Sequence, residues 1–183
     1  AYGENIMLGY HNLPEKTKET ITPDGGLRTG DLGHLDSEGY LYITGRVKEQ
    51  YKLDIGEYVA PAPLEETLKL SAYIDQVMLY GFNRPNNVAL IVAAMPAVEQ
   101  YAQSNGISGS GENLLKESSI RDLFREELSV YGKDFKSFEH PQNFALLAEE
   151  WSIDNGLLTP TLKLKREVVE QKFKDQIESL YSE

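Results

Sequence analysis

VMLYGF at residues 77–82 and VALIVA at residues 88–93 are nearly continuous apolar runs. NRPNN at residues 83–87 separates them, and its proline and asparagines are typical of a turn. Continuous apolar runs of this length are typical of strands that are buried on both faces. The stretch therefore predicts an antiparallel pair of central strands in the core of an α+β unit.

The flanking sequence supplies further elements of this unit. Apolar spacing predicts helices over residues 98–104 and 119–132, with Ser119 and Asp122 as a capping box, and a strand over residues 144–147. Upstream, a helix is expected over residues 64–70, with Glu65 in its first turn, after two short strands joined across residues 54–56. A last helix is expected to begin near Arg166.

The N-terminal piece, up to about Arg46, is rich in turns and β-prone residues. PDGG at residues 23–26 and DSEG at residues 36–39 are turn signals, and strands are expected at residues 5–10 and on both sides of the second turn. The predicted fold class is thus α+β. A β-rich piece precedes a small unit with a central three-stranded sheet and a short hairpin, flanked by helices.

Composition and charge narrow the classes of function. The 183 residues include 18 basic and 29 acidic side chains, a net charge of −11, which argues against a broad nucleic-acid-binding surface. Cysteine is absent, so no disulfide, thiolate metal site or cysteine nucleophile is expected. No apolar run is long enough for a transmembrane helix, and the start AYGENIMLGY resembles no signal peptide. A cytoplasmic protein is expected.

Three groups of residues could carry chemistry. Asp31, on a glycine-flanked loop, could accept hydrogen bonds from a ribose diol, and Arg46 could bind a phosphate or diol. Lys163 lies in a basic run with Lys165 and Arg166, and a lysine presented on a loop can stabilise charge developing at phosphorus. Taken singly, these residues are better explained as a turn aspartate, an exposed arginine and a solvated basic edge strand.

Other catalytic signals are weak. His11, His34 and His140 show no metal-ligand or carboxylate spacing, so no metal site is expected. A glycine-rich phosphate loop of the G-x-x-x-x-G-K-[ST] type is missing from the sequence, and SGSG at residues 108–111 lacks its lysine.

Several motifs in order resemble the adenylate-forming superfamily, and specifically the long-chain fatty acyl-CoA ligases. RTGDLG at residues 28–33 is similar to the family's T-G-D segment, GYLYITGRVKE at residues 39–49 to its hinge segment, and NGLLTPTLKLKR at residues 155–166 to its C-terminal lysine motif. GENIMLGY at residues 3–10 also matches, and residues 50–61 resemble the long-chain subgroup. Glycine usually precedes the motif lysine elsewhere in the superfamily, and this position is Leu162 here.

The resemblance implies roles for four residues and for the two segments that meet at one of them. Asp31 would hold the ribose hydroxyls of AMP, Arg46 would contact the nucleotide, and Lys163 would be the catalytic lysine. Lys48 would be the hinge between residues 1–48, the end of the large AMP-binding domain, and residues 49–183, the mobile C-terminal lid. The chain would then be a C-terminal fragment, inactive alone in the full reaction and completed by an upstream N-terminal domain of the same polypeptide.

The implied reaction has two steps. A fatty acid carboxylate attacks the α-phosphorus of MgATP to give an acyl-adenylate, and the lid then rotates so that the segment with Lys52, Gly56 and Glu57 faces CoA. ATP with Mg²⁺ and CoA would be substrates of the full-length enzyme, none bound tightly by this part, and peripheral membrane association of the whole protein is left open. Two alternatives remain: a ligase for an aryl or medium-chain acid, and a non-catalytic interaction module that keeps the lid fold.

Overall fold

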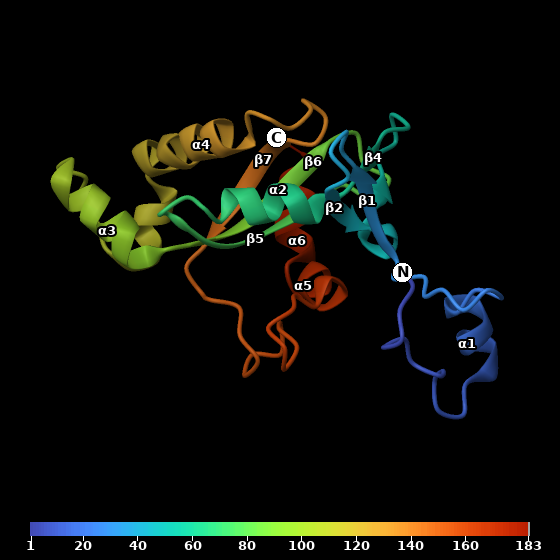
Figure 1. Ribbon diagram of the computed structural model, residues 1–183. Coiled ribbons are helices and arrows are strands. Elements are labelled where there is room, and N and C mark those ends of the chain that lie inside the picture. Colours follow the sequence, from blue (N-terminus) through green and yellow to red (C-terminus); the bar gives the residue numbers. More distant parts are fainter. Residues whose placement is uncertain (183) are drawn as a thin grey trace. The chain divides into compact units, whose positions relative to one another are not determined.

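The computed structural model describes residues 1–182, which form two compact units (Figure 1). Unit 1 comprises Ala1–Gln50 and unit 2 begins at Tyr51. Each unit is described by itself. That unit 1 is the end of a larger domain and unit 2 a mobile lid stays a prediction.

Unit 1 is built on an antiparallel hairpin of β1 (Asp31–Leu35) and β2 (Leu41–Arg46), followed by the 3-10 turn η1 (Val47–Glu49). The turn predicted at residues 36–39 is present. The carboxylate of Asp36 accepts the backbone N–H groups of Glu38 and Tyr40, both at 2.9 Å. Asp36 thereby supplies the hydrogen bonds that reverse the chain.

The strand predicted at residues 5–10 is wrong, because this segment is irregular and packs beside a helix. The helix is α1 (Pro14–Thr20), and the backbone N–H of Tyr10 donates to the hydroxyl of Thr17 within it at 2.9 Å. Pro14 occupies the first helical turn, where its missing N–H costs nothing. The helix buries no residue, so it leaves no apolar period in the sequence from which it could be predicted.

Unit 2 is organised by a three-stranded sheet in the order β5–β6–β7. The strands are β5 (Ile74–Tyr80), β6 (Asn87–Ala93) and β7 (Pro141–Leu147). β5 and β6 are antiparallel, as predicted, whereas β6 and β7 are parallel. All seven residues of β6 are buried, but β5 is an edge strand, so only β6 is central.

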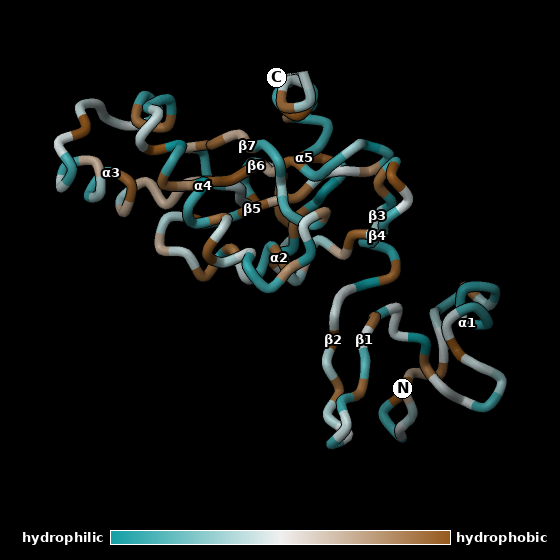
Figure 2. Tube along the Cα trace, turned by 90° about the horizontal axis from the view of Figure 1, so that it is seen from above, coloured by the Kyte–Doolittle hydropathy of each residue, from teal (hydrophilic) through white to brown (hydrophobic). Residues whose placement is uncertain are grey.

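Helices cover both faces of this sheet, which appears as the apolar middle of unit 2 in Figure 2. One face packs against α2 (Pro61–Leu68), α3 (Met95–Ser104), the 3-10 segment η2 (Gly111–Lys116) and α4 (Ser118–Gly132). The other face packs against Trp151 and against α5 (Arg166–Lys172) and α6 (Lys174–Ser179). The predicted α+β class is confirmed, with a three-stranded sheet, a short hairpin and flanking helices.

Three details of the helices differ from the prediction. α2 begins at Pro61, so Glu65 lies in the helix body rather than in the first turn, and it is buried. The capping box is wrong, because Ser119 makes no cap hydrogen bond and Asp122 pairs with Arg125. The last helix breaks at Phe173, whose φ of −105° and ψ of 20° separate α5 from α6.

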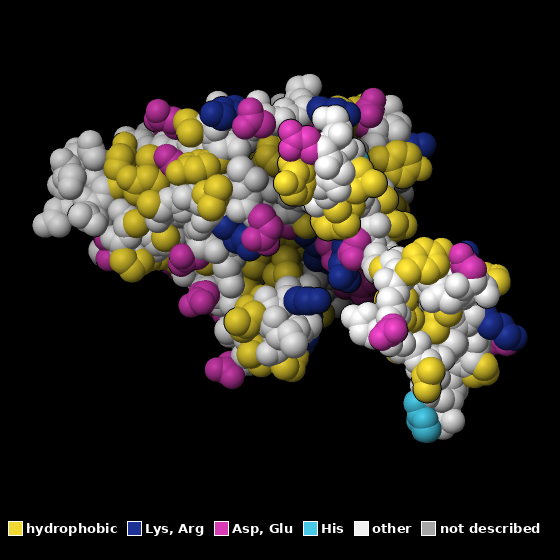
Figure 3. Space-filling model, in the orientation of Figure 1, with side chains coloured by type: hydrophobic (Ala, Val, Ile, Leu, Met, Phe, Trp, Pro, Cys, Tyr) yellow, Lys and Arg dark blue, Asp and Glu magenta, His cyan; other side chains and the backbone are white. Residues whose placement is uncertain are grey.

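None of the helices within residues 1–182 is both long and apolar enough to cross a membrane. On the face shown in Figure 3, acidic and basic side chains are interspersed. Over the same described residues, the histidine and carboxylate side chains form no group of three that could hold a metal ion.

Candidate active-site elements

In unit 1 the hairpin brings Asp31 and Arg46 together. The two residues face each other at the open end of the ladder, and Oδ1 of Asp31 lies 3.0 Å from Nε of Arg46. The backbone N–H of Asp31 donates to the Thr29 hydroxyl at 3.2 Å, and Gly30 has a φ of 77° that favours glycine. The Asp31 side chain is 26% exposed and the Arg46 side chain 53% exposed, so a ligand can reach both. The structure thus places the two predicted nucleotide-binding residues side by side.

The register that pairs Asp31 with Arg46 depends on Gly33. The ladder shifts at Leu32 and Gly33, where a β-bulge occurs. A Cβ atom at Gly33 would collide with the backbone carbonyl of Tyr42 on the facing strand. A backbone atom cannot move away as a flexible side chain can, so any side chain at this position would separate the strands.

Lys48, the predicted hinge, lies in η1 and is exposed. The backbone N–H of Val47 donates to the Gly30 carbonyl at 2.9 Å, so the chain is held at the start of this turn. Unit 1 ends at Gln50, two residues beyond Lys48.

In unit 2 the residues predicted to face CoA share one hairpin, formed by β3 (Tyr51–Lys52) and β4 (Tyr58–Val59). Lys52, Gly56 and Glu57 are all exposed there. Gly56 has a φ of 96° in the turn, which explains the glycine. The Lys52 ammonium lies 5.6 Å from the centroid of the Tyr58 ring.

This hairpin is fastened to the turn between β5 and β6. The backbone N–H of Asn83 donates to the Lys52 carbonyl at 2.9 Å, and that of Asp54 donates to the Arg84 carbonyl at 3.0 Å. Leu53, between them, is buried. The backbone that carries the exposed residues of the hairpin is therefore held in place by these bonds and by Leu53.

A buried asparagine, Asn87, also holds the β3–β4 hairpin in place. Its side-chain oxygen accepts the Tyr51 hydroxyl at 2.7 Å, and its amide nitrogen donates to the carbonyls of Phe138 and Glu139 at 3.0 and 2.8 Å. Burial raises the pKa of Tyr51, so its hydroxyl stays protonated and remains a donor. A Cβ atom at Gly81 would collide with the Asn87 side chain, so the site needs glycine there. Sequence analysis missed this network, whose only signal is a polar residue opening an apolar run.

Lys163 lies on a second short loop of unit 2, here called the lysine loop (residues 157–165). Leu158 and Leu164 form an isolated antiparallel bridge at its base. The backbone N–H of Thr159 donates to the Lys163 carbonyl at 2.8 Å, and that of Lys163 donates to the Thr159 hydroxyl at 3.0 Å. Leu157 and Leu158 are buried while Lys163 is exposed. The loop therefore presents the lysine at its tip on an apolar base.

The residue before Lys163 adopts a conformation that favours glycine. Leu162 has a φ of 59°, and its N–H donates to the Thr159 carbonyl at 2.9 Å, closing a tight turn with Pro160 at the second position. A residue in the left-handed region after such a turn is typical of a short hairpin loop. Leu162 thus occupies a backbone position that glycine adopts more readily than any other residue.

Substitution of Leu162 tests whether its left-handed backbone conformation is strained. Leu162→Val is expected to lower the free energy of unfolding by about 1–2 kcal/mol, since β-branched residues tolerate the left-handed region poorly. Leu162→Gly is expected to leave it within about 0.5 kcal/mol, because relief of strain offsets the greater freedom of the unfolded chain. Urea unfolding of the two variants measures the difference. Equal stability of both variants would contradict the assigned turn.

The basic run of the sequence separates in the structure. Lys163 is exposed, whereas Arg166 turns inward and forms an ion pair with the buried Glu65 of α2. The alternative of a basic edge strand is wrong, because residues 159–163 form a turn rather than a strand of a sheet. The Glu65–Arg166 pair was also missed, because nothing in the sequence relates α2 to the start of α5.

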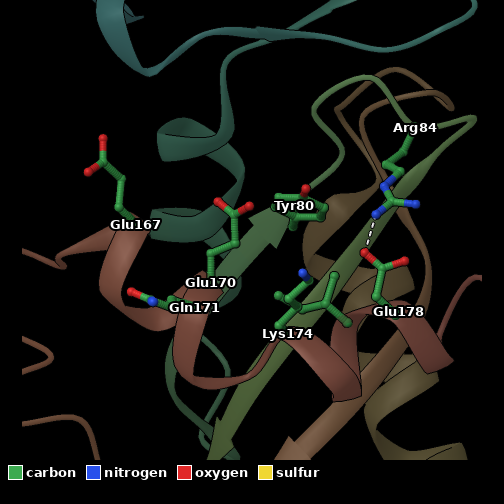
Figure 4. Close-up of a pocket in the computed structure, with 8 residues that line it drawn as sticks. Tyr80, Arg84, Glu167, Glu170, Gln171, Lys174 and Glu178 are labelled. Carbon is green, nitrogen blue, oxygen red and sulfur yellow. Dashed lines mark hydrogen bonds and ion pairs between the residues drawn. The ribbon is translucent and has the colours of Figure 1, made fainter.

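A surface hollow lies between β5 and the last two helices (Figure 4). Glu167, Glu170 and Glu178 outnumber its cations, Arg84 and Lys174, and Arg84 is already ion-paired with Glu178. The Arg84 guanidinium also lies 4.9 Å from the centroid of the Tyr181 ring. The charge balance disfavours an anionic ligand, and the contacts fasten α6 to the turn that holds the β3–β4 hairpin.

Comparison with solved structures defines the class of protein. The chain superposes with a TM-score of 0.80 on the adenylation domain of a carboxylate reductase from Mycobacterium chelonae, at 28% identity over 98% of this chain and 27% of that one. The corresponding domain from Segniliparus rugosus, solved with AMP and a co-purified carboxylic acid, also gives 0.80, at 26% identity over 99% of this chain and 27% of that one. The fold is that of an adenylate-forming enzyme.

Comparison with curated sequences gives the family. The chain is 38% identical over 182 residues to mouse long-chain-fatty-acid–CoA ligase 5 and 38% identical over 183 residues to human long-chain-fatty-acid–CoA ligase 1. These matches cover 98% of the chain and 27% and 26% of the relatives, so the chain spans about a quarter of their length. No protein-family model matches. The chain is a homologue of the long-chain fatty acid–CoA ligases and corresponds to a C-terminal part of them, as its motifs indicated.

Proposed function

We propose that the protein containing this chain is an ATP-dependent long-chain fatty acid–CoA ligase. The observation that carries the proposal is the lysine loop, which presents Lys163 at an exposed tip, on buried leucines, directly after a residue in the left-handed conformation. The homology over 98% of the chain supports the long-chain acid as substrate. A cytoplasmic location stays a prediction for the full-length protein, and its peripheral membrane association stays open.

In this proposal unit 1 supplies part of the nucleotide site. The Asp31 carboxylate accepts hydrogen bonds from the ribose hydroxyls of AMP. Arg46, which is ion-paired with Asp31, contacts the nucleotide. Leu35, Leu41 and Ile43 of the same hairpin are each more than half exposed, which fits a piece of a larger domain that covers them in the whole protein. That upstream domain would carry the remaining ATP contacts and the fatty acid site.

The first step joins the acid to AMP. A carboxylate oxygen attacks the α-phosphorus of ATP, and pyrophosphate leaves as the acyl-adenylate forms. The Lys163 ammonium bridges the carboxylate and phosphate oxygens and stabilises the charge that develops between them. Magnesium arrives with ATP, and no residue of this chain is assigned to it.

The second step transfers the acyl group to CoA. Rotation about Lys48 withdraws Lys163 and brings the β3–β4 hairpin, with Lys52, Gly56 and Glu57, to the site. The CoA thiolate attacks the acyl carbon, and AMP leaves. The rigid attachment of this hairpin supports its use as a surface that moves as one body with unit 2.

The substrate has one competing candidate. The carboxylate reductase neighbours share the fold at 26–28% identity, so a ligase for a different acid, aryl or medium-chain, fits the same geometry. The full-length protein should release AMP and form the thioester with CoA in the presence of ATP and a long-chain fatty acid. Activity only with aryl or medium-chain acids would favour the competing candidate. A lack of activity with every acid tested would favour a non-catalytic module.

Asp31→Asn in the full-length protein is expected to raise the KM for ATP by about 10- to 100-fold. The amide keeps one acceptor oxygen but loses a charge-assisted hydrogen bond of about 1.5–3 kcal/mol. Initial rates at varied ATP concentration measure the change. The matched control is Asp36→Asn in the turn of the same hairpin, where one acceptor oxygen suffices. An unchanged KM in Asp31→Asn would remove Asp31 from the nucleotide site.

A further inference from the structure

The free edge of β5 is closed by two charged side chains at Leu79. The Glu65 carboxylate of α2 accepts the Leu79 N–H at 2.7 Å, and the Arg166 guanidinium donates to the Leu79 carbonyl at 3.3 Å. Arg166 and Glu65 are also ion-paired with each other. The pair thus satisfies both backbone groups that a further strand would otherwise bond.

Both charges of this pair are withdrawn from solvent. The Glu65 side chain is 9% exposed and the Arg166 side chain 28% exposed. A buried charge that loses its partner is strongly unfavourable, so the structure holds the two groups in one arrangement. The Arg166 backbone is therefore fixed relative to α2 and β5.

Arg166 follows the lysine loop directly. Lys163 precedes it by three residues, and the backbone N–H of Lys165 donates to the Leu157 carbonyl at 2.9 Å. At the other end of the loop, Leu157 and Leu158 are buried in the core. The loop is thus anchored at its start by apolar packing, and its last residue is followed directly by the anchored Arg166.

We propose that Glu65 and Arg166 act as positioning residues for the adenylation step, by setting the direction in which the lysine loop presents Lys163. This inference rests on the proposed function. Neither side chain touches substrate. Their role is to keep the lysine where a displacement of about 1 Å would lower the rate about 100-fold.

The test uses Glu65→Gln in the full-length protein. The amide oxygen can still accept the Leu79 N–H, but the ion pair with Arg166 is lost. The kcat of acyl-adenylate formation is expected to fall about 100-fold with little change in the KM for ATP. Thioester formation from supplied acyl-adenylate, which does not use Lys163, is expected to stay within about threefold and serves as the check on folding.

Arg84→Gln is the matched control, because it breaks another partly buried arginine–glutamate pair of unit 2, with Glu178, away from the lysine loop. Adenylation is expected to stay within about threefold in this variant, because the Arg84–Glu178 pair lies outside the lysine loop. Arg166→Lys keeps the charge with fewer donors and is expected to retain more adenylation than Glu65→Gln. If Glu65→Gln does not fold, the comparison of Arg166→Lys with Arg84→Gln decides.

Two results would overturn the inference. One is an equal loss of both half-reactions in Glu65→Gln or Arg166→Lys, which a general loss of stability explains. The other is full adenylation in these variants while Lys163→Ala abolishes it. Failure of the proposed function looks different, because the unaltered full-length protein would then adenylate no fatty acid.

Discussion

Lys163→Ala in the full-length protein is expected to lower acyl-adenylate formation by about 100- to 1000-fold while thioester formation from supplied acyl-adenylate persists. The exposed ammonium at the loop tip has no backbone role, since the loop is closed by main-chain bonds and by Thr159. Removing a preorganised charge from a developing oxyanion costs about 3–4 kcal/mol, which corresponds to this loss of rate. Fatty-acid-dependent exchange of pyrophosphate into ATP measures the first step alone.

Lys165→Ala is the matched control for Lys163→Ala. Lys165 lies two residues further along the same loop, and its position is fixed by a main-chain bond to Leu157. Adenylation is expected to change by less than about threefold. Loss of activity in Lys165→Ala with activity retained in Lys163→Ala would shift the catalytic position by two residues. Equal loss of both half-reactions in Lys163→Ala would contradict the assignment of Lys163 as the catalytic lysine of adenylation.

Asn87→Ala is expected to lower the free energy of unfolding by more than about 3 kcal/mol. Asn87 is fully buried and binds three groups, the Tyr51 hydroxyl and two backbone carbonyls. Each buried group left without a partner costs about 1–3 kcal/mol. Because Tyr51 begins the β3–β4 hairpin, thioester formation should also weaken more than adenylation. Urea unfolding and the two half-reactions measure these effects.

Two variants calibrate this expectation. Tyr51→Phe removes one of the three hydrogen bonds while keeping the ring, and should cost about 1 kcal/mol. Asn105→Ala removes an exposed bond to the Tyr101 carbonyl at the end of α3, and should change stability by less than about 0.5 kcal/mol. An Asn87→Ala variant as stable as Asn105→Ala would show that the buried network contributes little.

The parts of the fold that sequence predicted are those with a strong local signal. Apolar runs revealed β5 and β6, and glycine-rich turns revealed the hairpins of β1–β2 and β3–β4. α1 was missed because it buries nothing, and the strand expected at residues 5–10 was wrong because its backbone bonds instead to the Thr17 hydroxyl. Where a helix packs on no core, propensity alone does not reveal it.

The candidate site divides in the same way. The family motifs predicted Asp31, Arg46 and Lys163 as site residues, which stays a prediction, and the structure places the first two in an ion pair. Glu65 and Asn87 could not be predicted, because their partners come from distant segments of the chain. A buried polar residue within an apolar run, as at Asn87, is the one local sign that such a contact exists.

The parallel pairing of β6 with β7 has a consequence for synthesis. Val88 pairs with Asn143 of β7, and α3, η2 and α4 lie between the two strands in the sequence. The second edge of β6 is therefore covered only after these three elements have been synthesised. Until then the chain carries a strand that is apolar from Val88 to Ala93 and has an open edge, which is prone to pair with other chains. A chain that ends before Pro141 is therefore expected to aggregate more readily than the same chain with β7 present.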